Sequence, residues 1–330
     1  MTDFITNLES ISPEWLSAVL KKKPITHVEV ETRELNTAHA GRLHVRYANA
    51  SESERFFFKI GRRYSEVSFY QYIAPQSPEL PLVHCYHARF ADELGQSNLL
   101  FDDITKTHHD LSVPLPPSQE TINQLMSILG NFHRVWWEDT RLKSDPIARQ
   151  IDDLPAFVLS QVIPQFGHFV DILGDGLSLE RRQLYERILA ALPLKAQQER
   201  IQQQQQVTIV HGDAHFYNFA YPNDPAQAIY IQDWALWHVN IPTYDLAYMF
   251  SRCFPEFRKR VEQSALLTYH QHLSPIAYSW EQLWSDYRMA MVYHTIWPIF
   301  FHQFASTERW YTLFECGMSA FEELECEEFI

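Results

Sequence analysis

The sequence predicts an α+β fold of two parts, an antiparallel sheet with one helix at residues 1–103 and a mainly helical part at residues 104–330. Short runs in which apolar and polar residues alternate dominate the first part, as in half-buried strands. After residue 103, the apolar residues recur at helical spacing. The length of 330 residues suits two domains of about 100–200 residues each. We therefore expect an N-terminal sheet domain and a C-terminal helical domain.

The N-terminal part begins with a short helix, because Ser12 can act as its cap and Pro13 suits the first helical position. This helix is expected to run to about Lys21. Strands follow where apolar residues alternate with polar ones, and polar turns near 36–41 and 49–54 join them into hairpins. The expected strands are 28–32, 43–47, 56–60, 82–90 and 97–101, with one helix at 65–73 between the third and the fourth.

Helices dominate the C-terminal part. Ser118 can cap a segment whose apolar residues fall on one face, namely Ile122, Leu125, Met126, Leu129, Phe132 and Trp136. Further helices are expected at 156–172, 178–192, 243–254, 256–273, 280–302 and 306–323. The stretch 289–304 is apolar but contains His294, Pro298 and His302, so it predicts a buried helix rather than a membrane span.

The chain carries 27 basic and 41 acidic residues, a formal net charge of −14. This charge repels phosphate backbones, so we expect no nucleic-acid partner. The same charge would attract a cationic substrate, or it serves solubility alone. The four cysteines are scattered and the N-terminus lacks a signal-peptide pattern. We therefore expect a cytoplasmic protein with reduced thiols and no membrane partner.

One segment combines short strands with oxygen-bearing side chains. The strand-like residues 207–210 lead into a polar loop that holds Asp213 and, five residues later, Asn218. The apolar residues 228–231 then lead to Asp233, fifteen residues after Asn218. Phosphoryl transfer needs a carboxylate that takes the proton of the acceptor hydroxyl, and hard oxygen ligands for magnesium. Asp213 suits the first role, and Asn218 and Asp233 suit the second.

The segment 211–218 reads H-G-D-A-H-F-Y-N and resembles the H-G-D-x-x-x-x-N loop of the aminoglycoside phosphotransferase and choline kinase superfamily. The segment 231–234 reads I-Q-D-W and resembles the I-D-[WFY] segment that follows in that superfamily, with one inserted residue. The resemblance implies the two-lobed fold of protein kinases, with the N-lobe at 1–103 and the C-lobe at 104–330. It also implies Asp213 as the catalytic base and Mg²⁺ on Asn218 and Asp233.

Neighbouring residues are expected to support this site. Asp245 lies in a segment that resembles the superfamily's Asp-Leu-Ala helix start, which implies that it caps a helix and holds the catalytic loop. His211 is expected to bond to backbone near the loop, and His215 to line the site or the substrate entrance. The tryptophan pair at 136–137 and the Asp-Trp pair at 233–234 resemble the ecdysteroid-kinase-like branch of the superfamily.

The N-terminal part contains residues that the resemblance assigns to the nucleotide. Lys59, on the third expected strand, would contact the α- and β-phosphates, and Glu66, seven residues later, would pair with it. The loop at 36–42 would cover the phosphates, although it contains a single glycine to let the backbone approach them. The strand and hinge that would bond to the adenine ring include Leu100, Phe101 and Asp102.

The expected function is transfer of the γ-phosphoryl of ATP or GTP to a hydroxyl of a small molecule, either cationic or partly apolar. A pseudokinase that only binds a ligand is an alternative, supported by the glycine-poor loop. A protein kinase is another, but the sequence has no Asp-Phe-Gly or Ala-Pro-Glu triplet. A metal-dependent hydrolase would use His211, Asp213 and His215, but a loop with a glycine disfavours a zinc-binding histidine pair. The acceptor, the choice of ATP or GTP and the oligomeric state stay open.

Overall fold

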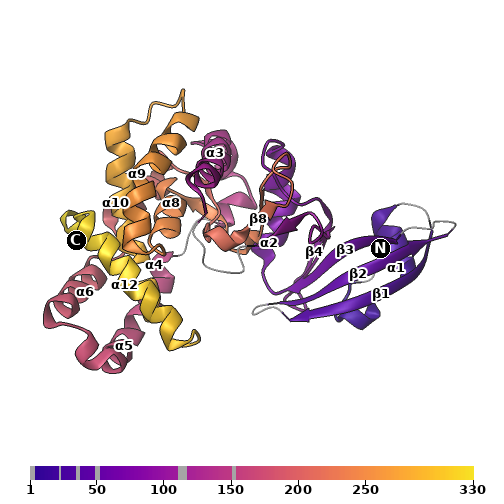
Figure 1. The fold of residues 1–330 in the computed structure, drawn as a ribbon, viewed down its shortest axis with the longest axis horizontal. Helices are drawn as coiled ribbons and strands as arrows, with labels where there is room; N and C mark the ends of the chain where they lie inside the picture. Colours follow the sequence, from indigo (N-terminus) through magenta and orange to yellow (C-terminus); the bar gives the residue numbers. More distant parts are fainter. Residues whose placement is uncertain (1–3, 22–23, 35–37, 49–52, 111–116, 151–153) are drawn as a thin grey trace. The chain divides into compact units, whose positions relative to one another are not determined.

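The computed structural model of the protein describes residues 4–21, 24–34, 38–48, 53–110, 117–150 and 154–330. Its contacts group into two compact units, which are described separately (Figure 1). The first unit comprises Met1–Pro114 and Tyr217–Leu236, and the second comprises Leu115–Phe216 and Trp237–Ile330. Residues 217–236 thus group with the N-terminal part, whereas the division expected from the sequence assigned them to the C-terminal part.

A five-stranded antiparallel sheet forms the centre of the first unit, as the sequence predicts. The strand order is β1-β2-β3-β5-β4. The strands are β1 (Ile25–Glu34), β2 (His39–Tyr47), β3 (Ser53–Gly61), β4 (Cys85–Ala91) and β5 (Gln96–Asp102). The first three are longer than expected, because backbone pairing continues beyond the residues that alternate between apolar and polar.

Gly41 lies inside β2 rather than in the turn expected at 36–41. It is paired on both sides, with β1 and with β3. A Cβ atom at this position would lie 3.0 Å from Val30 Cγ1, so glycine is the residue that fits here without displacing a neighbour. The expected placement of Gly41 in a phosphate-covering turn is therefore wrong. Residues 36–37 of that turn, and 49–52 of the second expected turn, lie outside the described residues.

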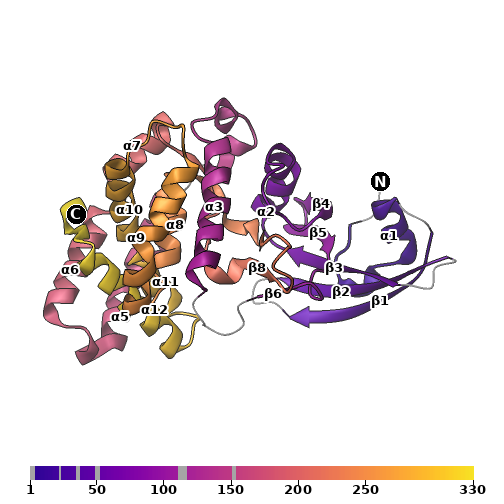
Figure 2. The ribbon, with the colours of Figure 1, turned by 45° about the horizontal axis from the view of Figure 1, so that its top comes forward.

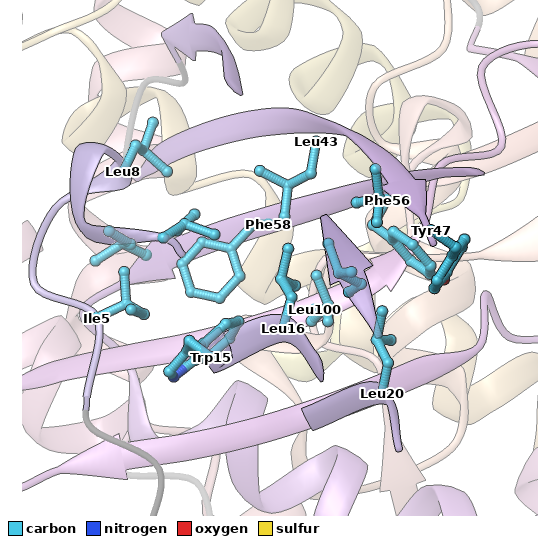
Figure 3. Packing of buried hydrophobic residues seen from close by; sticks show 14 residues of the cluster. Ile5, Leu8, Trp15, Leu16, Leu20, Leu43, Tyr47, Phe56, Phe58 and Leu100 are labelled. Atoms are coloured by element: carbon cyan, nitrogen blue, oxygen red, sulfur yellow. The ribbon is translucent and has the colours of Figure 1, made fainter. Parts of the chain in front are cut away.

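Apolar side chains from the helix α1 (Pro13–Leu20) and from the sheet form the core of the first unit (Figure 3). Ser12 caps α1 as predicted, and its Oγ accepts a hydrogen bond of 3.2 Å from the Trp15 N–H. The Trp15 ring meets Phe58 of β3 edge-on, with ring centroids 5.5 Å apart. Further members of this core are Ile5, Leu8, Leu16, Leu20, Leu43, Tyr47, Phe56 and Leu100. The helix α1 therefore covers one face of β2, β3 and β5.

The helix expected at 65–73 is present, but its geometry changes along its length. It is α-helical at α2 (Tyr64–Ser68), π-helical at Phe69–Ile73 and 3₁₀-helical at Ala74–Gln76. Phe69 stacks on Trp234 with ring centroids 3.8 Å apart. The Ser65 hydroxyl donates a hydrogen bond of 2.6 Å to the carbonyl of Ala235. These contacts hold residues 234–235 against α2.

Residues 217–236 form a short hairpin within the first unit. Its strand β8 (Phe219–Pro222) pairs with β9 (Tyr230–Ile231) and with β6 (His108–His109). The Ile231 N–H also donates a hydrogen bond of 3.0 Å to the carbonyl of Pro81. These strands are two to four residues long, too short to show an alternating pattern. The sequence therefore predicted β9 but neither β6 nor β8.

The second unit is mainly helical, as predicted, and also holds an antiparallel pair of strands, β7 (Thr208–Val210) and β10 (His238–Asn240). The long helices are α3 (Gln119–Val135), α5 (Phe166–Leu173), α6 (Leu179–Ala191), α7 (Lys195–Gln203), α8 (Thr243–Phe250), α9 (Pro255–His272), α10 (Trp280–His294) and α12 (Thr307–Glu323). Shorter ones are α4 (Leu154–Phe157) and α11 (Trp297–Phe301). The helix α3 packs along α9, and α8 packs along α10 (Figure 2).

Two of the expected helices are interrupted near prolines. The helix expected at 156–172 is divided into α4, a π-helical turn, a 3₁₀ turn that contains Pro164, and α5. The helix expected at 280–302 is divided into α10 and α11, with Pro298 in the first turn of α11. Proline lacks the N–H that a helix interior requires, which explains both breaks. Across the described residues, no helix combines the length and the apolar character needed to cross a bilayer.

Candidate active site

Lys59 of β3 lies between two carboxylates within the first unit. Its Nζ is 2.8 Å from Glu66 Oε1 and 3.1 Å from Asp233 Oδ1. Burial lowers the pKa of Lys59, but the attraction of Glu66 and Asp233 outweighs burial and raises it. Burial also raises the pKa of Glu66, an effect that the Lys59 charge only partly offsets. The structure thus brings together three of the predicted site residues around one ammonium group.

The local fold explains how Asp233 reaches Lys59. The following residue, Trp234, is fully buried against α2, and Asp233 itself has a left-handed backbone with φ of 62°. This conformation is uncommon for residues other than glycine and is found at functional sites and tight turns. It leaves the Asp233 side chain 46% exposed, whereas that of Glu66 is 4% exposed. One carboxylate is therefore enclosed with Lys59 and the other stays open to a ligand.

Asn218 and Asp233 lie at the same end of the β8–β9 pair. Phe219 pairs with Ile231, and the next residues outward are joined by a hydrogen bond of 2.9 Å from the Gln232 N–H to the Asn218 carbonyl. An amide oxygen and a carboxylate are donors that Mg²⁺ takes in proteins, completed by phosphate oxygens and water. The part of the chain that the structure describes contains no group of three His, Cys, Asp or Glu side chains placed to hold a metal.

Asp245 holds the loop that contains His211, Gly212 and Asp213 within the second unit. Its Oδ2 accepts a hydrogen bond of 2.7 Å from the His211 N–H, and its Oδ1 accepts one of 2.9 Å from the Gly212 N–H. His133 Nε2 lies 3.2 Å from Oδ2. Burial raises the pKa of Asp245, but hydrogen bonding and the charge of His133 outweigh burial and lower it. The N-cap of α8 is Pro242, so the expectation that Asp245 caps the helix is wrong.

Asp213 follows these two residues, and polar side chains of Tyr248 and His215 lie near its carboxylate. Tyr248 donates a hydrogen bond from its hydroxyl to Asp213 Oδ1. His215 Nε2 lies 3.6 Å from Oδ2. The Asp213 N–H donates to His211 Nδ1 at 3.2 Å, so the proton of a neutral His211 ring is on Nε2. Burial raises the pKa of Tyr248, as does the adjacent Asp213 charge, so the phenol stays protonated and acts as the donor.

Sequence reasoning missed Tyr248, although its spacing carries a signal. It lies three residues after Asp245 on α8, and residues at this spacing share a helix face. One face of α8 therefore holds the loop backbone through Asp245 and the Asp213 carboxylate through Tyr248. Sequence reasoning also missed His133, whose Nδ1 lies 2.7 Å from the Tyr269 hydroxyl on α9. The contacts of His133 with Asp245 and with Tyr269 therefore connect the loop to α3, α8 and α9.

The residues expected at the adenine hinge lie at the end of β5. Leu100 and Phe101 are buried and pair with β3, so their side chains belong to the core. Asp102 Oδ1 accepts a hydrogen bond of 2.8 Å from the Tyr86 hydroxyl, and the Asp102 N–H donates to the His84 carbonyl at 3.1 Å. The Asp102 N–H is already used within the sheet, so a hydrogen bond between adenine and this strand would have to involve a different backbone group.

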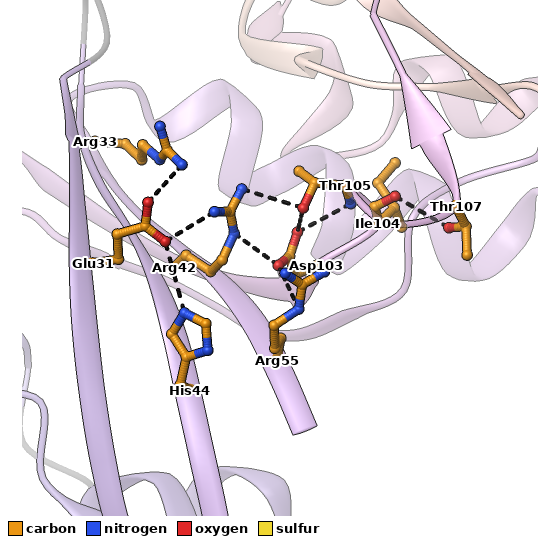
Figure 4. Close-up of polar contacts among 9 residues, drawn as sticks. All are labelled: Glu31, Arg33, Arg42, His44, Arg55, Asp103, Ile104, Thr105 and Thr107. Carbon is orange, nitrogen blue, oxygen red and sulfur yellow. Dashed lines mark hydrogen bonds and ion pairs between the residues drawn. The ribbon is translucent and has the colours of Figure 1, made fainter. Parts of the chain in front are cut away.

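Asp103, the next residue, fixes the segment that follows β5 (Figure 4). Its side chain is 1% exposed and lies 2.9 Å from Arg42 Nε and 3.3 Å from Arg55 Nε. It also accepts hydrogen bonds from the Thr105 N–H and hydroxyl, at 3.1 Å and 2.7 Å. Burial raises the pKa of Asp103, but the Thr105 bonds and both arginines outweigh it and lower the pKa. Sequence reasoning did not identify this cluster, whose members are far apart along the chain.

Several solved structures share the fold of this chain. A proposed aminoglycoside phosphotransferase from Ralstonia eutropha matches with a TM-score of 0.59 and 13% identity, over 96% of this chain and 97% of that one. The choline kinase LicA of Streptococcus pneumoniae matches with a TM-score of 0.52 and 16% identity, over 94% and 97%. A spectinomycin phosphotransferase in complex with ADP and spectinomycin matches with a TM-score of 0.53 and 14% identity, over 96% and 99%. At such identities, these likenesses concern the fold.

The sequence itself shows the family. No curated protein matches the chain. The model of the phosphotransferase enzyme family, by contrast, matches residues 27–282, which is most of the chain. This span contains Lys59, Glu66, the loop with Asp213 and Asn218, and Asp233, and it confirms the superfamily expected from the sequence motifs. The ecdysteroid-kinase-like branch stays a prediction. The chain belongs to the phosphotransferase enzyme family.

Proposed function

We propose that this protein is a small-molecule kinase that transfers the γ-phosphoryl of ATP to a hydroxyl group. The observation that carries the proposal is the position of Lys59 between buried Glu66 and exposed Asp233. A lysine held in this way presents its charge to phosphate oxygens, and an open carboxylate beside it can take a metal ion that bridges those oxygens. A structural ion pair would need only one of the two carboxylates.

The residues divide the work of transfer between them. The acceptor oxygen forms a bond to the γ-phosphorus, and the bond from that phosphorus to the bridging oxygen of ADP breaks, leaving its electron pair on ADP. The hydroxyl proton goes to the Asp213 carboxylate. Asn218 and Asp233 would hold Mg²⁺, which when bound offsets the negative charge of the phosphate oxygens. Lys59 binds the nucleotide phosphates, and Tyr248 keeps the Asp213 carboxylate in one orientation.

Relatives support the choice of adenine nucleotide. The choline kinase LicA has been solved in complex with AMP, and the spectinomycin phosphotransferase with ADP. We therefore propose ATP rather than GTP as the phosphoryl donor. The four cysteines have free thiols, three of them buried, which fits the reducing environment of the cytoplasm proposed from the sequence.

The proposal is tested by measuring nucleotide binding and ADP release with and without magnesium. We expect ATP to raise the melting temperature only when Mg²⁺ is present, and ADP to be released when a hydroxyl acceptor is added. The variants Asn218→Ala and Asp233→Ala should lose the magnesium-dependent part of both signals. Asp224→Ala, at an exposed loop position in the same hairpin, serves as the matched control. Equal stabilisation by ATP without metal, or in Asp233→Ala, would contradict the proposed roles.

A further inference from the structure

Arg252 lies close to the candidate base within the second unit. Its guanidinium carbon is 3.5 Å from the centroid of the Tyr248 ring, and the hydroxyl of that ring donates to Asp213. One phenol side chain and one hydrogen bond therefore separate the guanidinium from the base carboxylate. A permanent positive charge is thus one side chain away from the carboxylate that is proposed to accept the hydroxyl proton.

Arg252 differs from the other arginines of this unit that are at least partly buried. Each of those others has a carboxylate oxygen within 3.0 Å, in the pairs Arg141–Asp139, Arg181–Glu315, Arg200–Asp286, Arg258–Glu262 and Arg288–Glu328. In the described part of the chain, no carboxylate lies within ion-pair distance of Arg252. A chain with a net charge of −14 offers many carboxylates, yet among the described arginines of this unit that are at least partly buried, Arg252 is the one without such a partner.

The hydrogen bonds of Arg252 hold one edge of its guanidinium. Its Nη1 donates to the Tyr248 carbonyl at 3.2 Å and to the Ser251 hydroxyl at 3.3 Å. No acceptor among the described residues takes a hydrogen bond from Nε or Nη2. A guanidinium carries five N–H donors in a fixed plane. The two bonds of Nη1 therefore orient the whole group, and the donors on Nε and Nη2 remain for a ligand.

Arg252 also lies beside His294, Trp297 and Pro298, which pack around it. His294 Nε2 lies 3.0 Å from the Tyr244 carbonyl and must donate to it, while Nδ1 accepts from Trp297 Nε1 at 3.1 Å. Both bonds require the neutral ring. Burial lowers the pKa of His294 well below its ordinary value, and the Arg252 charge lowers it further. The histidine therefore adds no positive charge beside Arg252 near pH 7.

We propose that Arg252 binds a carboxylate on the acceptor, so that the acceptor is a small hydroxy acid rather than a cationic alcohol. This inference rests on the proposed function, because it names the acceptor class of the same transfer. A guanidinium binds a carboxylate through two parallel N–H donors, and one fixed charge matches the single charge of that group. The short path from Arg252 to Asp213 requires few carbons between carboxylate and hydroxyl. The rings of Trp297 and Phe301 beside Arg252 favour an acceptor with an apolar body.

The test uses matched acceptors that share one carbon chain with a terminal hydroxyl. One series ends in a carboxylate, the second in its methyl ester, and the third in an ammonium group, each at several chain lengths. Magnesium-dependent ADP release and phosphate incorporation are measured for wild type, Arg252→Gln and Arg252→Lys. We expect the carboxylates to be preferred, and Arg252→Gln to raise their KM roughly tenfold or more while changing kcat much less. Arg252→Lys should restore part of the loss.

The exposed Arg260→Gln, on α9, is the matched control and should behave as wild type. A higher kcat/KM for ammonium or ester acceptors would overturn the proposal, as would an equal effect of Arg252→Gln on acid and ester. Binding of magnesium-ATP without transfer to any hydroxy acid would also overturn it. Failure of the proposed function has a different signature, because ATP would then neither bind with magnesium nor be consumed with any acceptor series.

Discussion

Asp245 Oδ2 accepts a hydrogen bond of 2.7 Å from the backbone N–H of His211. The other oxygen of the same carboxylate binds the Gly212 N–H, so two consecutive amides of the loop are held by one side chain. The carboxylate is fully buried, so water does not replace either bond. The position of Asp213, the next residue, therefore depends on a residue of α8 that would not touch the substrate.

Replacing Asp245 with asparagine removes one of the two acceptor oxygens and the charge that faces His133. Because the site is buried, we expect unfolding to become easier by about 2–3 kcal/mol and turnover to fall strongly. Urea unfolding followed by fluorescence measures the first effect, and ADP release measures the second. Asp171→Asn, at an exposed position of α5, is the control. Unchanged stability in Asp245→Asn would contradict the assigned hydrogen bonds.

Lys59→Met should leave Glu66 buried without its cation. We expect a loss of stability of about 3 kcal/mol at neutral pH, together with weaker binding of magnesium-ATP. The double variant Lys59→Met/Glu66→Gln removes the buried charge as well and should recover most of the stability but none of the ATP binding. Chemical unfolding and calorimetric titration separate the two effects. ATP binding that survives in both variants would show that Lys59 does not contact the phosphates.

Tyr248→Phe removes the hydroxyl that binds Asp213 but keeps the ring beneath Arg252. We expect kcat to fall by roughly 10- to 100-fold, with the KM for ATP little changed, because the base loses its fixed orientation and not the nucleotide site. Tyr311→Phe, on α12, is a suitable control. Steady-state kinetics decide the matter, since a purely structural role for Tyr248 would alter the melting temperature but not kcat.

His294 makes the stability of the second unit depend on pH. Its pKa is lowered in the folded protein, so the neutral ring contributes stability that is complete above about pH 6.5 and is lost as the pH falls below that value. The loss should approach about 1.4 kcal/mol per pH unit for this one group. The free energy of unfolding should therefore fall less between about pH 7 and 5 in His294→Gln than in wild type. Parallel pH profiles for the two proteins would contradict this account.

Local patterns predicted those parts of the molecule that depend on neighbouring residues. The Ser12 and Ser118 caps, the five strands and the spacing from Lys59 to Glu66 are of this kind, and the structure contains each of them. Asp233 was predicted as a site residue from its motif, but its contact with Lys59 spans 174 residues and needed the fold.

Contacts between distant segments account for what the sequence did not reveal. The hairpin at 217–236 joins the first unit through strands too short for any periodicity, and it pairs with residues near 108. The Asp103 cluster collects arginines from β2 and β3, more than 40 residues away along the chain. Tyr248 is aromatic and buried, so composition alone does not separate it from core residues such as Phe250.

The most direct test of the proposed transfer is a comparison of Asp213→Asn with wild type. Asparagine keeps the size of the side chain but is a much poorer proton acceptor than a carboxylate. We predict that the variant binds magnesium-ATP with unchanged affinity in calorimetric titration and loses transfer of the γ-phosphoryl to the acceptor by about 100-fold or more. Phosphoryl transfer at the wild-type rate in Asp213→Asn would contradict the central claim that this carboxylate is the catalytic base.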